Sequence, residues 1–116
     1  MAISVTNFTG TKAVSTTEWS MTTDTAGPDA STTVGMFQAF IDLNALAAAD
    51  VFEFRVYEKA RAADTQRLCF YARFANAQAA PIYLSPALIL GAGWDMTLIK
   101  VAGADRTITW SIRGAT

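Results

Sequence analysis

A stretch of regular alternation between residues 51 and 74 constrains the fold more than any other part of the chain. It reads VFEFRVYEKARAADTQRLCFYARF, with apolar residues at every second position in each half and polar or charged residues mostly between them. Successive side chains of a β-strand point to opposite faces of its sheet, so this pattern predicts two strands with one buried and one solvated face. The loop from Ala60 to Gln66 joins them into a long hairpin. The predicted buried set is Phe52, Phe54, Val56, Leu68, Phe70, Ala72 and Phe74.

The segments on either side of this hairpin carry further strand signals. Residues 13–23 are rich in Thr, Ser and β-branched residues, and we predict a strand there with Trp19 and Met21 on its inner side. Residues 24–35 form an exposed loop, and residues 44–50 form one helical turn or a tight connection in which Leu46 closes the end of the core. The other predicted strands cover residues 36–43, 94–101 and 106–113, the last two paired as a second hairpin.

Two prolines mark residues 81–90 as a different kind of strand. Proline cannot donate a hydrogen bond to a neighbouring strand, so this segment is predicted to lie at a sheet edge or to break at Pro86. Together these signals predict an all-β fold: a single-domain β-sandwich or small β-barrel of about 7–8 mostly antiparallel strands with at most one short helical turn. Residues 1–12 are a possible N-terminal strand or docking arm, and residues 13–116 form the single β domain.

The composition argues against several classes of function. The chain has no histidine, which removes the commonest general base and the commonest transition-metal ligand. The net charge is −1 and the basic residues are scattered, so we expect no direct nucleic-acid binding. The apolar runs are shorter than the ~18–20 residues of a membrane helix, and no signal peptide is visible. We therefore expect a protein made in the cytoplasm, with no membrane partner.

No group of residues indicates catalysis, a cofactor or a metal site. Glu53 and Glu58 are five residues apart in one strand, which places them on opposite faces and prevents them from acting as an acid/base pair. The only cysteine, Cys69, is interpreted as a small semi-buried side chain, because a nucleophilic thiol would need a histidine partner. Asp24 and Asp29 lack the regular spacing of a calcium loop, so we interpret them as solvated loop acids. The protein is predicted not to be an enzyme.

The solvated face of the central hairpin is the candidate interaction site. Tyr57 and Tyr71 lie on this face with Arg55 and Arg73, and Tyr and Arg are enriched at the centres of protein interfaces. Phe8, isolated in the N-terminal segment, completes the predicted interface. An alternative interpretation is that the aromatic residues only cover the neighbouring sheet. Hydrophobic residues make up 52% of the chain, which favours a protein that buries further surface in an assembly.

Four blocks of sequence resemble a group of short phage-encoded proteins, and the resemblance extends over nearly the whole chain from Gly10 onward. The blocks are STTEWSMTTDTAGPD, FIDLNALAAADVFEFRVYEKARAADTQRL, LILGAGWDMTLIK and GADRTITWSIR, in this order. They are similar to head accessory proteins of tailed bacteriophages, which are capsid decoration or cement proteins. The resemblance identifies no catalytic signature, and no functional residue is carried over from the family.

The resemblance implies a structural virion protein on the outer surface of the capsid. Such a protein would bind the major capsid protein, bridge neighbouring copies of it and stabilise the shell. The resemblance also implies a homotrimer at threefold or quasi-threefold positions. Two alternatives remain open at this point: a tail or head-to-tail connector component, and a carbohydrate-binding module on the virion surface that uses Trp19, Trp94 or the exposed tyrosines.

Overall fold

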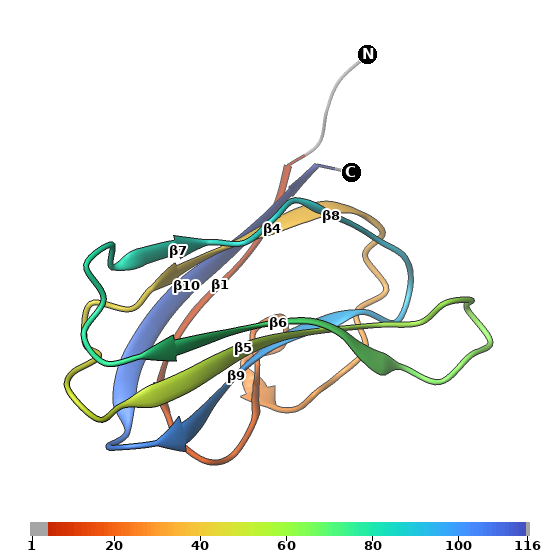
Figure 1. Cartoon of the computed structure of the whole chain (residues 1–116). Helices are drawn as coiled ribbons and strands as arrows, with labels where there is room; N and C mark the ends of the chain where they lie inside the picture. The colour runs from red at the N-terminus through yellow and green to blue at the C-terminus, as the bar shows by residue number, and fades with distance from the viewer. Residues whose placement is uncertain (1–4, 116) are drawn as a thin grey trace.

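The computed structural model describes residues 5–115 and shows two antiparallel β-sheets packed face to face (Figure 1). No helix occurs in this part of the chain, and therefore none that could span a membrane. The predicted all-β fold is confirmed, as a β-sandwich. The strands are β1 (Val5–Val14), β2 (Trp19–Ser20), β3 (Thr25–Ala26), β4 (Gly35–Asp42), β5 (Val51–Glu58), β6 (Arg67–Ala75), β7 (Ile82–Leu84), β8 (Leu88–Leu90), β9 (Asp95–Ala102) and β10 (Arg106–Ala115).

The first sheet has the order β1–β10–β4, with β7 and β8 following one another along the free side of β4. β1 pairs with β10 over its whole length, from Val5 opposite Ala115 to Val14 opposite Arg106. Residues 5–12 therefore lie in a strand of this sheet, and the boundary drawn between residues 12 and 13 falls inside β1. Residues 1–4 of the predicted strand or arm lie outside the described residues.

The break predicted at Pro86 is confirmed, because it separates β7 from β8. Ser85 bridges the gap between the two short strands. Its amide donates to the carbonyl of Ala39 at 3.0 Å, and its hydroxyl accepts the amide of Ala39 at 2.8 Å. β4 thus stays hydrogen-bonded at the point where its neighbour is interrupted. The prolines leave this edge of the sheet poorly suited to pairing with another strand.

The second sheet has the order β3–β2–β9–β5–β6, and the predicted central hairpin forms its β5–β6 part. Phe52, Phe54 and Val56 are fully buried, as the alternation predicts. Leu68 was expected on the same face, and this is wrong: it is 48% exposed. The register shifts between Val56 and Tyr57, so that Leu68 pairs with Tyr57 on the outer face. A β-bulge adds one residue to a strand and reverses the facing of every residue beyond it.

Two predicted strand arrangements are wrong because each placed in one sheet segments that belong to two different sheets. β9 and β10 were expected to form a hairpin, but β9 pairs with β2 and β5 while β10 pairs with β1 and β4. The turn between them carries the chain from one sheet to the other. Residues 13–23 were expected to form one strand, but the chain leaves the first sheet after Val14 and enters the second at Trp19. Alternation indicates which side of a strand is buried, but it does not indicate which other strand pairs with it.

Asp50 holds the turn between the sheets in place. Its carboxylate is buried and accepts hydrogen bonds from Arg106 Nε at 2.7 Å, from the amide of Ala47 at 2.8 Å and from the amide of Ala104 at 3.1 Å. Gly103 has a φ of 90° and lies so close that a Cβ there would collide with Asp50. These contacts join the β4–β5 connection to the β9–β10 turn. The connection contains no helix, and Leu46 closes the end of the core as a buried residue.

The contacts of Asp50 predict how the stability of the protein depends on pH. The hydrogen bond from Arg106 is the largest of several effects that hold the pKa of Asp50 below its ordinary value. An aspartate with a lowered pKa stabilises the folded state above its unfolded pKa, about pH 4, and loses this contribution as the pH falls through the folded pKa. The stability advantage of the wild type over Asp50→Asn should therefore be constant above about pH 5 and shrink below pH 4.

Urea unfolding of both proteins between pH 2 and pH 7 measures this difference. The comparison must be between the two proteins, because burial raises the pKa of Asp95 and so gives the whole protein a contribution of opposite sign. A stability advantage of the wild type that stays constant down to pH 2 would show that the charge of Asp50 does not contribute to stability.

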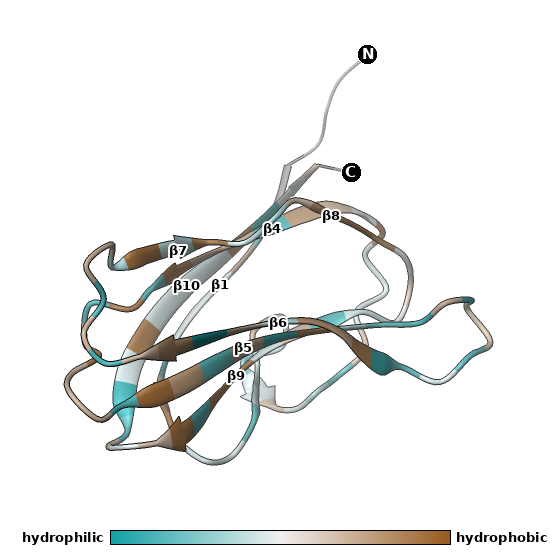
Figure 2. Ribbon diagram, in the orientation of Figure 1, coloured by the Kyte–Doolittle hydropathy of each residue, from teal (hydrophilic) through white to brown (hydrophobic). Residues whose placement is uncertain are grey.

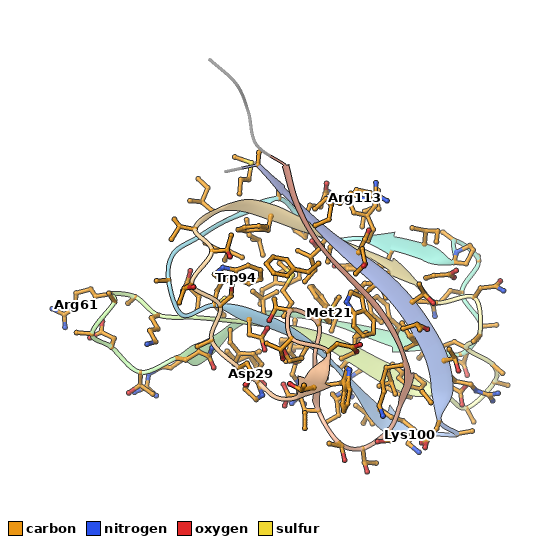
Figure 3. The ribbon with its side chains drawn as sticks, turned by 180° about the vertical axis from the view of Figure 1, so that it is seen from behind. Met21, Asp29, Arg61, Trp94, Lys100 and Arg113 are labelled. Carbon is orange, nitrogen blue, oxygen red and sulfur yellow. The ribbon has the colours of Figure 1, made fainter. Side chains whose placement is uncertain are left out.

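The core between the sheets is apolar and centred on aromatic rings. The Trp94 ring lies 4.7 Å from Phe37 and 5.9 Å from Phe8, measured between centroids, and its Nε1 donates to the carbonyl of Thr33 at 2.7 Å. Gly114 lies opposite Phe37, and a Cβ there would collide with its ring. Figure 3 shows Trp94 and Met21 inside the sandwich. The buried apolar residues are Val14, Met21, Phe37, Ala39, Ile41, Leu43, Leu46, Phe52, Phe54, Val56, Phe74, Leu90, Trp94, Met96, Leu98, Ile108, Trp110 and Ile112.

Candidate interaction surface

The outer side of the first sheet is almost free of charge, and we call it the neutral face. It consists of the residues that alternate with the buried ones along β1, β4, β7, β8 and β10. Among the described residues of this face, Asp42 and Arg113 are the only charged ones. The face comprises Asn7, Thr9, Thr11, Ala13, Met36, Gln38, Phe40, Asp42, Ile82, Leu84, Ile89, Thr107, Thr109, Ser111, Arg113 and Ala115.

Large apolar side chains gather at the β7 and β8 side of the neutral face. Ile89 is 83% exposed and pairs with Met36, while Leu84, 51% exposed, pairs with Phe40. Ile82, at the end of β7, is also half exposed. Hydrophobic colouring marks much of β7 in Figure 2. Contiguous exposed apolar residues of this kind on a soluble protein commonly mark a binding surface.

Arg113 lies on β10, the strand between β1 and β4, where it is opposite Asn7 and Gln38. Its guanidinium carbon is 3.8 Å from the centroid of the Phe40 ring, and its Nε donates to the hydroxyl of Ser111 at 3.1 Å. Arg113 also borders two shallow hollows. One, of about 340 Å³, lies toward Asp42 and Ile82, and the other, of about 230 Å³, is lined by Met36, Gln38, Ala87 and Ala115 among others. Figure 3 shows Arg113 on the outside of β10.

The outer side of the second sheet is different, because its charges are paired with one another. Glu53 accepts hydrogen bonds from Arg55 Nε at 2.6 Å and from Arg73 Nη2 at 3.0 Å. Burial raises the pKa of Glu53, but the two guanidinium groups outweigh this effect and the pKa lies below its ordinary value. Glu18 accepts from Tyr57 Oη at 2.6 Å, from Thr97 at 2.6 Å and from Arg55 Nη1 at 3.2 Å. The charged groups of Glu18, Glu53, Arg55 and Arg73 on this face therefore have hydrogen-bond partners within the protein.

Four of the five residues predicted for the interface lie together on the outer face of the second sheet, and Phe8 does not. Arg55, Tyr57 and Arg73 belong to the network just described, and Tyr71, on the same face, is 59% exposed. Phe8 is on the other sheet and packs against the core beside Phe37 and Trp94. Three of the five side chains thus already have partners within the protein, and one points inward. The sequence does contain a signal for the neutral face: Thr107, Thr109 and Ser111 alternate with buried residues without a charge among them.

The residues considered for other activities are engaged elsewhere. Glu58 accepts the amides of Lys59 and Gly91, so it ties the hairpin to the loop before β9. Cys69 is exposed rather than semi-buried, and its thiol donates to the carbonyl of Val56 at 3.3 Å. Partial desolvation of the sulfur, with the nearby charge of Glu58, raises the pKa of the Cys69 thiol, which is the opposite of what a reactive thiolate needs.

The aromatic residues considered for sugar binding are largely unavailable. Trp94 is fully buried. Trp19 is half-buried, with its Nε1 bonded to Asp24 at 2.9 Å and Lys12 Nζ 4.1 Å from its ring centroid. The loop acids Asp24 and Asp29 accept hydrogen bonds from side chains of their own loop and of β2. Within residues 5–115, no three His, Cys, Asp or Glu side chains are grouped as metal ligands would be.

The β5–β6 hairpin projects beyond the body of the sandwich (Figure 1). Gln66 anchors its base by donating to the carbonyl of Asp29 at 2.6 Å and to that of Gly93 at 2.8 Å. At the tip, Arg61 pairs with Asp64 at 3.0 Å. An open hollow of about 600 Å³ lies between its arms, with charges of both signs in its lining. The hairpin is a second candidate for contact with a partner.

Comparison with known proteins does not place the chain in a family. A scan against models of protein families finds no match, and a search of curated proteins also finds none. The resemblance to phage head proteins therefore stays a prediction.

Proposed function

We propose that this protein is a structural component of a virus particle, a decoration protein that binds the outer surface of a tailed-phage capsid. The observation that carries the proposal is the neutral face, a broad sheet surface with exposed Met36, Ile82, Leu84 and Ile89 and very little charge. Such a surface loses little solvation of charged groups when it is covered and gains from the burial of apolar area. The sequence blocks that resemble phage head proteins give this surface its expected partner, the major capsid protein.

The contrast between the two outer faces supports an orientation on the shell. The Glu18 and Glu53 networks leave the second sheet with paired charges, which is suitable for a face in contact with water. In the proposed arrangement the neutral face lies on the capsid and the second sheet faces outward. The projecting hairpin reaches sideways and contacts a neighbouring capsid subunit. Contacts at two places let one small domain bridge subunits, and many copies on one shell add to its stability.

Quantitative mass spectrometry of purified particles, with a reconstruction of the particle, tests the proposal. We expect hundreds of copies on the outer surface of the capsid, arranged as trimers at threefold or quasi-threefold positions. About a dozen copies or fewer, located at the neck or tail, would replace the decoration function by the connector alternative. Absence of the chain from the particles would reject both.

A further inference from the structure

Arg113 is held in an arrangement suited to binding a carboxylate. Its guanidinium lies over the Phe40 ring, and Ser111 occupies only its Nε. Its two Nη groups make no hydrogen bond or ion pair with any residue between 7 and 115. A guanidinium stacked on an aromatic ring keeps its N–H groups at the edge of a fixed plane, and this geometry matches the two oxygens of a carboxylate.

The surroundings of Arg113 restrict what can carry that carboxylate. The hollows lie on either side of Arg113 along β10, one beside Phe40 and Ile82 and the other beside Met36 and Ala87. In an extended segment the residues two places before and after a given one project to the same side, about 6–7 Å away from it. An acidic residue with apolar residues at those two positions would therefore fill both hollows while it pairs with Arg113.

We propose that the neutral face binds an extended segment of another protein in which an Asp or Glu is flanked, two residues away on each side, by apolar side chains. The inference rests on the proposed function in taking the neutral face as the docking surface, and it adds the residue that recognises the partner and the chemistry of the partner. A single arginine with Asp42 on the same face is too little positive charge for a nucleic acid. A second copy of this chain is a poorer match, because Asp42, the acid of this face, already accepts the Asn44 amide at 3.0 Å through its Oδ1.

Titration of the ¹⁵N-labelled protein with two short peptides, followed by NMR, tests this inference without a virus particle. The first peptide is acetyl-Leu-Thr-Asp-Thr-Leu-amide, and the second has Asn in place of Asp. We expect saturable shifts of β4, β7, β8 and β10 resonances, including the Arg113 side-chain Nε–H, with the Asp peptide. Binding of the Asn peptide should be about tenfold weaker or undetectable, because a hydrogen-bonded charge pair is lost.

Variants of Arg113 separate recognition from simple charge. Arg113→Gln should weaken binding of the Asp peptide about tenfold and leave little difference between the two peptides. Arg113→Lys should restore only part of the affinity, because an ammonium group cannot pair with both oxygens in one plane. Arg61→Gln, a change of the same kind at the exposed hairpin tip, is the control and should leave the affinity unchanged.

Three results would overturn the inference: no binding of the Asp peptide, equal binding of both peptides, or shifts confined to the second sheet. A fourth is a dimer, seen by light scattering, that dissociates on Arg113→Gln, because a second copy would then be the occupant. None of these results decides whether the protein is found on the capsid, which the particle measurements test separately. Failure of this inference and failure of the proposed function are therefore distinguishable.

Discussion

Replacing Trp94 with alanine is expected to lower the free energy of unfolding by about 3–5 kcal/mol. Its ring is fully buried and packs against Phe37 and Phe8, which come from the opposite sheet. The substitution would leave a large cavity where the sheets meet, and the carbonyl of Thr33 would lose its hydrogen bond from the indole. Because removal of a buried aromatic side chain costs both transfer free energy and cavity formation, this should be among the most damaging single changes in the protein.

Urea unfolding followed by circular dichroism measures the effect. Trp19→Ala is the matched control, since it removes the same side chain from a half-buried position, and it should cost about 1–2 kcal/mol. A loss below about 1 kcal/mol for Trp94→Ala would contradict the packing described here. Equal losses of unfolding free energy for the two variants would show that the deeper burial of Trp94 adds nothing to its contribution to stability.

Ile89→Asp is expected to weaken binding to capsid shells about 30- to 100-fold, equivalent to about 2–3 kcal/mol. Ile89 is 83% exposed in the apolar part of the neutral face, opposite Met36. In the proposed complex the new carboxylate would be buried against apolar surface and would lose its hydration without gaining a partner. In the free protein the same position is open to water, so folding should be little affected.

Co-sedimentation with shells assembled without this protein measures the binding. Val101→Asp is the matched control, because Val101 is also an exposed β-branched side chain in a strand but lies on the second sheet, at the end of β9 away from the projecting hairpin. It should bind as the wild type does. If Val101→Asp lost binding and Ile89→Asp kept it, the second sheet would be the docking face and the proposed orientation would be reversed.

The parts of the fold that the sequence predicts are those set by local alternation. Phe52, Phe54 and Val56 are buried as expected. The break at Pro86 follows equally directly from the chemistry of proline. The pairing of strands is not local: β9 and β10 are adjacent in the sequence and lie in different sheets. The turn between them is fixed by Asp50, which comes from more than fifty residues earlier.

The candidate site was harder to predict for a related reason. Arg55 and Tyr57 look available in the sequence, but their partner Glu18 approaches from a distant loop and engages both. Leu68 looks buried, but one bulge turns it outward. The neutral face takes its residues from five strands, β1, β4, β7, β8 and β10, and they form one surface only because the sheet order places these strands side by side.

The pairing of β1 with β10 has a consequence for how this protein is made. Val5 lies opposite Ala115, so the first of the described strands finds its neighbour only after about a hundred further residues have been synthesised. Until then the edge of β1 that β10 will cover is unpaired, and closing so long a loop is slow compared with forming the β5–β6 hairpin. On the ribosome the second sheet can therefore begin to assemble early, while the sheet that carries the proposed docking face is completed only after β10 has been synthesised.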